Sequence, residues 1–345
     1  MKKIFTPFLV SFLLIACGNN NNLPDVSGSK VELSVQRFDE DLFTIDTNQV
    51  DKAVNTLNVK YPTLLPLFLQ TIVGVSDNEG VKEFYSRYKQ VYDSSQKLYR
   101  NFEPVKKEIE QALKYVKYYF PSYKIPGTIT TIVGPLNSRQ DMAQMRNGDY
   151  IPDFIGPDFI GISLQFYLGK DFSLYHHEYF ITNVAPLYLS RRFDREYIIG
   201  DVMKLVTEDI FPDKSKGKPL IEQMIERGKQ WWLLDKFLPK VADSVKTGYT
   251  QQQLEWCEAN EGLMWSYIIK NEDLYSVNPA TLQTYIGESP FTSVFSQELS
   301  PGNIGQWIGW QIVKKFAANN PNMKPEDVMQ STPKKILEEA KYKPK

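Results

Sequence analysis

The stretch Thr128-Ile129-Thr130-Thr131-Ile132-Val133, closed by Gly134-Pro135, decides the fold class of this 345-residue chain. All six residues before the glycine are β-branched, and β-branched residues favour extended strands. Segment 161–168 alternates apolar and polar residues as a half-buried strand does, and so does segment 31–37. The sequence therefore predicts a small β-sheet built from short, separated strands.

Helical patterns lie on both sides of these strands. Glu103-Pro104 interrupts one of them, so we expect the helices on either side of it to form an antiparallel pair, and Thr250 with Gln253 has the spacing of a capping box. The prediction is an α+β fold, predominantly α-helical with a small β-sheet, in a single globular domain of residues 31–345. Apolar residues recur at helical spacing over 61–74, 81–99, 105–120, 196–210, 220–238, 251–269, 304–318 and 325–342.

A short tandem duplication lies between two of the predicted strands. Pro152-Asp153-Phe154-Ile155-Gly156 is followed directly by Pro157-Asp158-Phe159-Ile160-Gly161. Repeat architectures have periods of about 20 to 50 residues, so this repeat is too short to found one. We interpret the duplication as paired turns. Calcium binding by Asp153 and Asp158 is the alternative, although the chain has no EF-hand-like array of ligands.

The N-terminus has the pattern of an exported bacterial lipoprotein. Lys2 and Lys3 precede an apolar run over 4–15, and Cys17 follows a small residue, as in a lipobox. The run is well short of the ~20 residues that a membrane-spanning helix needs. We predict that residues 1–16 are a signal peptide and that Cys17 carries fatty acyl chains such as palmitate. The alternatives are an ordinary signal peptide with a chance cysteine and an uncleaved, buried N-terminal helix.

Residues 17–30 are polar and rich in turn-forming residues, so we expect the lipidated cysteine to be followed by a flexible tether. No aspartate follows Cys17, so a signal for retention in the inner membrane is missing. The asparagine run 19–22 is uncharged and lacks the acidic cluster that would favour export to the outer surface. We therefore expect a membrane-anchored protein that faces the periplasm, with the outer membrane favoured over the inner membrane.

The composition excludes two classes of protein. Lys and Arg number 40 and Asp and Glu number 41, for a net charge of -1, so the chain lacks the basic field that attracts nucleic acid. The chain has two cysteines, and with Cys17 lipidated, Cys257 has no intramolecular partner, which excludes a disulfide scaffold. We expect Cys257 to pack as a small buried apolar residue.

His176-His177-Glu178 is the clearest enzyme candidate, because it contains both histidines of the chain. A zinc peptidase places histidines at i and i+4 of one helix, with a glutamate after the first. Here Ile181 takes the second ligand position, and adjacent helical residues do not face the same way. We interpret the histidines as a surface or loop pair and predict no catalytic residue, no metal and no cofactor. His177 and Glu178 remain catalytic candidates.

Two other segments stand out. Segment 191–197, Arg-Arg-Phe-Asp-Arg-Glu-Tyr, mixes both charges at a predicted helix start, which favours a structural ion network over a binding site. Gly302, Gly305 and Gly309 share one face of a predicted helix. A glycine inside a helix costs about 1 kcal/mol relative to alanine. Their spacing therefore predicts close approach by another element or a ligand, and core packing is the default.

Several blocks spread along nearly the whole chain stand out together. They are 37–43, 61–62, 167–171, 191–192 with 196–198, 300–313 and 341–344. In this order they resemble the GldB family of gliding motility lipoproteins of Bacteroidetes. The resemblance implies a cell-envelope lipoprotein of the gliding motility machinery, linked to type IX secretion, without a known reaction. We expect it to be noncatalytic, with protein components of that machinery as partners.

The C-terminal half is also distantly similar to zinc peptidases of the gluzincin type. Segment 195–199 stands where those enzymes have H-E-x-x-H, and Glu261 stands at the third ligand position. Arg195 and Ile199 offer zinc no donor electrons. The similarity implies a degenerate metallopeptidase fold, a pseudo-peptidase whose metal site is lost, with Glu196 and Glu261 as the remaining catalytic candidates.

Two other functions stay open at this stage. One is a divergent zinc-peptidase-like hydrolase of the envelope. The other is a lipoprotein that binds sugar or peptide through tryptophans, although their helical spacing favours core packing. The tryptophans concerned are Trp231, Trp232, Trp256 and Trp265.

Overall fold

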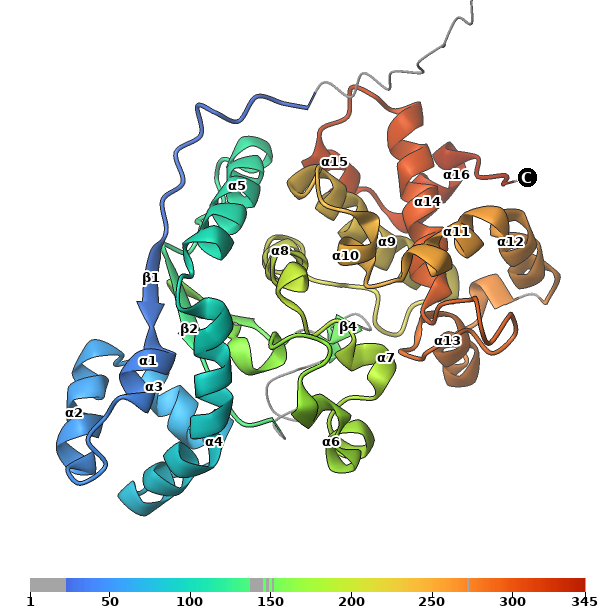
Figure 1. The fold of residues 1–345 in the computed structure, drawn as a ribbon. Helices are drawn as coiled ribbons and strands as arrows, with labels where there is room; N and C mark the ends of the chain where they lie inside the picture. The colour runs from blue at the N-terminus through green and yellow to red at the C-terminus, as the bar shows by residue number, and fades with distance from the viewer. Residues whose placement is uncertain (1–22, 137–144, 147–148, 151, 272, 345) are drawn as a thin grey trace, which may run out of the picture.

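The computed structural model describes residues 23–136, 145–146, 149–150, 152–271 and 273–344. The predicted signal peptide and Cys17 lie outside the described residues. From Leu23 the chain runs without helix or strand along the edge of the body into the first strand (Figure 1). Val26 is buried, so this part of the predicted tether already packs on the body. Nowhere in the described ranges is there a helix with the length and apolar character needed to cross a membrane.

A four-stranded mixed sheet forms around the predicted β-branched stretch. The strand order is β1-β2-β6-β5, with β1, β2 and β6 parallel and β5 antiparallel to β6. Ile129, Ile160 and Ile162 are fully buried. The sheet confirms the prediction of a mostly helical α+β fold. Its strands are β1 (Ser34–Arg37), β2 (Thr128–Ile132), β5 (Phe154–Ile155) and β6 (Phe159–Ser163), and β3 (Met145–Arg146) pairs separately with β4 (Asp149–Tyr150).

The tandem duplication is a β-hairpin, so the prediction of paired turns was wrong. The first Phe-Ile pair forms β5 and the second begins β6, with the Gly156 amide donating to the Phe159 carbonyl at 2.8 Å. Asp153 is buried, whereas Asp158 is exposed and pairs with Lys124 at 3.2 Å. The two aspartates therefore share no calcium site.

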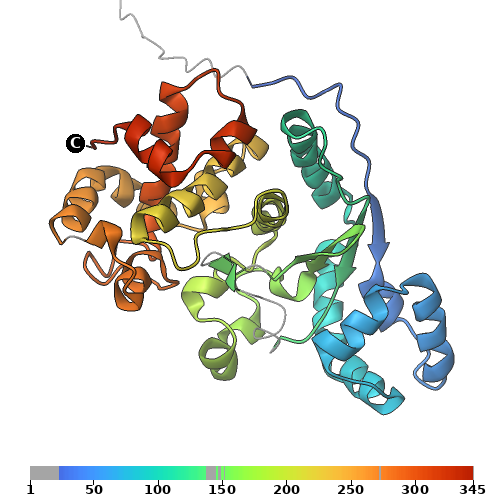
Figure 2. The same cartoon turned by 180° about the vertical axis from the view of Figure 1, so that it is seen from behind.

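The helices before β2 carry the N-terminal half of the core. Helices α4 and α5 lie end to end in both views (Figures 1 and 2), so the predicted antiparallel pair was wrong. Helix α5 reaches α8 and α9 and thereby joins this half to the C-terminal helices. The elements are α1 (Phe38–Phe43), α2 (Val50–Lys60), α3 (Leu64–Pro66), the π-helix η1 (Leu67–Val73), α4 (Asn78–Tyr99) and α5 (Glu103–Tyr119).

After β6 the described chain is helical, as predicted. The capping box of Thr250 and Gln253 is present, and Cys257 is buried. The elements are η3 (Leu164–Phe166), η4 (Ser173–His176), α6 (Glu178–Asn183), α7 (Leu187–Ser190), η5 (Arg195–Tyr197), α8 (Ile198–Ile210), α9 (Leu220–Phe237), α10 (Asp243–Thr247), α11 (Gln251–Ala259), α12 (Glu261–Lys270), η6 (Asp273–Tyr275), α13 (Pro279–Ile286), α14 (Ile304–Asn319), α15 (Pro325–Gln330) and α16 (Pro333–Ala340).

Glycines let α9 and α14 cross in backbone contact. A Cβ added at Gly309 would lie 1.7 Å from the Met224 carbonyl oxygen, and one at Gly228 would lie 2.1 Å from the Gly309 carbonyl carbon. A Cβ at Gly305 would lie 2.7 Å from a methyl group of Ile286. The predicted close approach is therefore confirmed for Gly305 and Gly309, which meet helices of the core. Gly302 does not share their helix face as predicted, because α14 begins at Ile304, and a Cβ at Gly302 would lie 1.9 Å from the Ser289 carbonyl oxygen.

Candidate functional site

The histidine pair lies on the surface. His176 ends η4 and its Nε2 lies 2.9 Å from the Lys170 carbonyl oxygen, while His177 precedes α6 and Glu178 opens it. All three side chains are exposed. Across the described residues, no three His, Cys, Asp or Glu side chains gather closely enough to hold a metal ion.

The positions aligned with a zinc peptidase are not brought together. Arg195 pairs with Glu108 at 2.8 Å, Ile199 is buried in the core, and Glu196 is exposed. Glu261 accepts a hydrogen bond from the Tyr342 hydroxyl at 2.6 Å. Helix α12, which Glu261 opens, lies at the outer edge of the molecule in both views, away from α8 (Figures 1 and 2).

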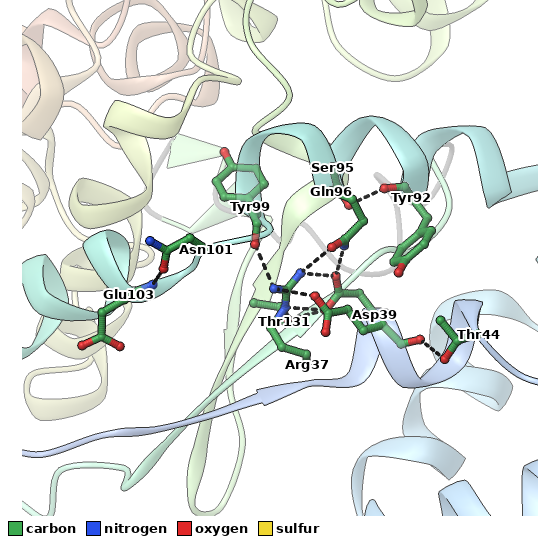
Figure 3. A network of polar contacts seen from close by, with 11 residues as sticks. Arg37, Asp39, Thr44, Tyr92, Ser95, Gln96, Tyr99, Asn101, Glu103 and Thr131 are labelled. Carbon is green, nitrogen blue, oxygen red and sulfur yellow. Dashed lines mark hydrogen bonds and ion pairs between the residues drawn. The ribbon is translucent and has the colours of Figure 1, made fainter.

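A buried cluster at the end of β1 centres on the Asp39 carboxylate (Figure 3). Arg37 donates to it through Nε at 3.1 Å and Nη2 at 2.8 Å, and Gln96 Nε2 donates at 2.9 Å. The Thr131 hydroxyl donates to the same carboxylate. Arg37 Nη1 also donates to the Tyr99 carbonyl at 2.8 Å. The cluster therefore ties β1, β2 and the end of α4 together.

We call this cluster the Arg37–Asp39 clasp. Its polar side chains hydrogen-bond to one another and to the Tyr99 carbonyl. Burial lowers the pKa of Arg37, but its hydrogen bond and charge interaction with Asp39 outweigh burial, so the pKa is raised. A buried charge that is paired and fully hydrogen-bonded stabilises a fold only modestly, whereas removal of one partner is costly. We therefore assign the clasp a structural role.

A second buried cluster joins two carboxyl groups through one phenol. The Tyr167 hydroxyl lies 2.7 Å from Asp153 Oδ2 and 3.1 Å from Asp201 Oδ2. Asp153 also accepts from the Ser163 amide at 2.8 Å, and Lys204 lies 3.4 Å from Asp201. Burial, reinforced by the charge of Asp201, raises the pKa of Asp153 to about 8. Asp153 is therefore protonated at neutral pH.

A small cationic cavity of about 50 Å³ lies where three connections meet. The sequence singled out parts of two of them, the arginine pair after α7 and the glycine-rich end of the α13–α14 connection. The third, the α10–α11 connection, carried no distinctive signal except Gly248. The residues that matter for its chemistry are Arg191, Arg192, Gly248, Tyr249, Glu288, Gly302 and Asn303.

The cavity wall is held in place by backbone hydrogen bonds. Arg191 Nη2 donates to the Gly248 carbonyl, and the Tyr249 hydroxyl donates to the Gly302 carbonyl at 2.8 Å. Gly248 has a φ of +74°, a left-handed conformation that favours glycine. Burial and the neighbouring charge of Arg192 lower the pKa of Arg191. The positive charges of Arg191 and Arg192 therefore lie close together in the cavity wall.

Asn303 also lines this cavity, although its side-chain oxygen is buried. Its backbone is left-handed, with a φ of +53°, and the residue is 6% exposed. Its Nδ2 donates to Gln306 Oε1 at 2.6 Å, whereas its Oδ1 is buried without a hydrogen-bond partner. Buried polar atoms in native structures are almost always paired, so this oxygen calls for an explanation.

Comparisons with known proteins give one result that spans the chain. Residues 19–344 match the family described as gliding motility protein GldB. Searches of curated proteins and of solved structures found no match. The family match includes the sheet, the clasp and the cationic cavity and does not rest on a single motif. The chain therefore belongs to the GldB family of gliding motility proteins.

Proposed function

We propose that this chain is a noncatalytic lipoprotein of the cell envelope that acts by binding protein components of the gliding motility machinery, in connection with type IX secretion. The observation that carries this proposal is the family match over residues 19–344, which includes every described helix and strand. A match of that extent concerns the whole folded body and not one motif.

The exposure and hydrogen bonding of the catalytic candidates support a noncatalytic role. A general acid or base must lie within hydrogen-bond reach of the group it serves, beside an orienting partner. His177 is exposed directly before α6, Glu178 is exposed at the first position of α6, and Glu261 is engaged by the Tyr342 hydroxyl. Glu196 is exposed beside Arg195, where a zinc peptidase would have a ligand.

Lipidation at Cys17 would hold this body close to a membrane. Only residues 18–22 separate Cys17 from Leu23, where the described chain begins. Even fully extended, a linker of that length spans about 20 Å. Anchoring in the outer membrane, with the body facing the periplasm, would place the protein within reach of envelope-spanning partners.

In-cell crosslinking tests the proposal. The full-length protein is crosslinked in gliding cells, and the captured proteins are identified by mass spectrometry. We expect enrichment of motility or secretion components relative to a Cys17→Ser variant expressed at the same level. Recovery of the uncrosslinked monomer alone, from cells in which a known envelope complex is captured efficiently, would contradict a role as a binding component.

A further inference from the structure

Charge is unevenly distributed along the chain. Of its 40 basic and 41 acidic residues, eight lysines and four carboxylates lie in residues 311–345, which leaves 32 basic and 37 acidic residues in the rest of the chain. The last segment is therefore positively charged, whereas the remainder is negatively charged. Its exposed lysines within the described residues are Lys315, Lys324, Lys334, Lys335, Lys341 and Lys343.

Most of these lysines are available to an outside partner. Lys334 lies 4.0 Å from Glu338, and the other five exposed lysines form no ion pair with any residue that the structure describes. Asn320 and Gln330 donate to the carboxylates of Glu339 and Glu326, at 3.4 and 3.2 Å. The positive charge of this segment is therefore largely uncompensated by its own carboxylates.

An open polar cleft of about 840 Å³ brings part of the segment together. The cleft lies between the end of α14, the α14–α15 connection and the start of α16. Lys335 lines it beside Asn320 and Asn322, and Lys324 directly follows Met323 of the lining. Ammonium and amide groups donate hydrogen bonds, which phosphate and hydroxyl oxygens accept.

This segment lies where the N-terminal chain leaves the body. In both views the start of the described chain is at the upper end of the molecule, together with the α14–α15 connection and α16 (Figures 1 and 2). Val26 is buried, so the chain is fixed to the body within a few residues of its exit. The direction of the N-terminal tether therefore marks this end of the molecule.

Helix α5 adds an aromatic residue at the same end. It begins where α4 ends and runs to the upper end of the molecule (Figures 1 and 2). Its last turn carries Lys117 and Tyr118, which are both exposed, and Tyr118 is 50% exposed. Tyrosine is enriched where proteins meet the membrane–water interface, so this turn suits a lipid surface.

We propose that the upper end of the molecule docks on a phospholipid bilayer with anionic headgroups. We call this surface the basic end, and it consists of residues 116–119 and 314–343. The inference rests on the proposed lipid anchor, because the anchor brings the basic end to the bilayer and charge then orients the body. Each lysine near an anionic lipid surface strengthens attachment roughly fivefold.

The length of the tether supports this orientation. With Cys17 lipidated, residues 18–22 would span about 20 Å at full extension. Helix α4 alone has 22 residues and is about 33 Å long, and it extends toward the opposite end of the molecule (Figure 1). The tether is therefore too short for the molecule to turn that opposite end to the bilayer.

The composition of the basic end favours a lipid surface over an acidic protein partner. Protein interfaces are centred on aromatic or arginine anchors and are depleted in lysine. Residues 311–345 contain no arginine, and over 311–344 no large apolar side chain is exposed. Lysine is a flexible point charge, which suits the diffuse charge of a bilayer.

Lysine labelling on vesicles tests this inference. The full-length protein, purified from membranes, is reconstituted with vesicles of phosphatidylcholine alone or mixed with phosphatidylglycerol, and a water-soluble N-hydroxysuccinimide ester modifies its lysines. Mass spectrometry measures the rate at each lysine. We expect Lys315, Lys324 and Lys335 to react at least threefold more slowly when phosphatidylglycerol is present. Lys52, exposed on α2 far from the basic end, should react equally on both vesicles.

Salt and free phosphate identify the source of the effect. The protection should vanish in about 1 M salt, where the Debye length falls to ~3 Å. Equal rates on the two kinds of vesicle would overturn the proposal, and so would equal protection of Lys52. Slower labelling of Lys335 by soluble inorganic phosphate on neutral vesicles would also overturn it, because the cleft would then be an anion site.

Variants without these charges assign the contacts. Lys324→Gln combined with Lys335→Gln should at least halve the protection of Lys315 on phosphatidylglycerol vesicles. Both side chains are exposed, so we expect the fold to be retained. Lys52→Gln combined with Lys82→Gln, far from the basic end, is the matched control and should leave the protection unchanged. An equal effect of the two double variants would refute the assignment.

Flotation separates failure of this inference from failure of the lipid anchor. Attachment to neutral vesicles depends on the acyl chains, whereas protection by phosphatidylglycerol depends on the basic end. A protein that floats with neutral vesicles and shows equal labelling on both would have the anchor without the docking surface. A protein that fails to float with neutral vesicles, but is protected by phosphatidylglycerol, would have the docking surface without the anchor.

Discussion

The fold accommodates two buried aspartates, Asp39 and Asp153, in different ways. Asp39 receives a bidentate arginine as well as an amide and a hydroxyl, so its charge is compensated in place. Within the part of the chain that the structure describes, Asp153 receives hydrogen bonds from the Ser163 amide and the Tyr167 hydroxyl, which are neutral. Burial without a cation favours the protonated form. Asp39 therefore has a cationic partner in the core, whereas Asp153 has none and keeps its proton.

Asp153→Asn should flatten the pH dependence of stability. An unfolded aspartate ionises near pH 3.9, whereas Asp153 keeps its proton up to about pH 8 in the fold. Between these values the folded state binds more protons, so the unfolding free energy falls as pH rises, by at most ~1.4 kcal/mol per pH unit. Asparagine does not titrate, so the variant should be more stable at pH 7 by about 1–3 kcal/mol.

Urea denaturation at pH 5, 6, 7 and 8 measures this effect. Asp158→Asn is the matched control, because it changes the same residue type in the second copy of the duplication, where the side chain is exposed. A slope of stability against pH that is identical in wild type and Asp153→Asn would contradict the assignment of the proton.

The histidine segment gives a prediction about activity. His177→Ala and Glu178→Ala should leave gliding unchanged in cells that express each variant at the wild-type level. The reason is that both side chains are exposed and no metal cluster forms within the described residues. Gliding speed on agar or glass measures the outcome. Loss of gliding in both variants, with normal protein levels, would favour the hydrolase hypothesis.

At the level of helices and strands, local patterns predicted most elements. The β-branched run forms β2. The patterns over 251–269 and 325–342 each predicted one helix, whereas each forms two, α11 with α12 and α15 with α16. The strand predicted over 161–168 ends at Ser163 and continues as η3. The duplication was interpreted wrongly because Phe-Ile is too short to show strand periodicity, and only the pairing of Ile155 with Ile160 reveals a hairpin. The orientation of α5 also followed from tertiary packing, since amphipathic spacing does not specify which way a neighbouring helix runs.

The close crossing of α9 and α14 predicts that Gly309→Ala lowers the stability of the protein. Gly309→Ala improves helix propensity by about 1 kcal/mol, but the new methyl group meets the Met224 backbone at 1.7 Å. Backbone cannot rotate away as a side chain can, so we expect a net loss of about 3 kcal/mol in unfolding free energy. Gly127→Ala, where nothing lies within 4 Å of the added Cβ, is the control for chemical denaturation. Equal stability of the two variants would contradict the crossing.

At the scale of the whole molecule, the candidate site could be predicted only in parts. The arginine pair and the glycine-rich helix start were both recognised, but the first was interpreted as a structural ion network and the second as core packing. The glycines confirm core packing for α14. That Arg191 and Asn303 line one cavity depends on how α7, α10 and α14 pack, which no local pattern encodes.

The proposed membrane attachment through Cys17 concerns the entire protein and has a direct test. Cys17→Ser removes the thiol that lipid would modify and leaves the folded body unchanged. We expect the wild-type protein in the membrane fraction, and we expect the variant to lack the acyl chains at its N-terminal segment. Mass spectrometry of the N-terminal peptide should show acyl chains. An unmodified N-terminus with unaltered fractionation would contradict lipidation.

The way the N-terminal chain enters the sheet determines how the protein would respond to tension. Figure 1 shows this chain running into β1 from its end, and all four residues of β1 are in register with β2. A pull along the strand would load these hydrogen bonds in shear, all at once, rather than peel them apart singly. The Arg37–Asp39 clasp lies at the far end of the same strand, so mechanical load would pass into β2 and α4 together.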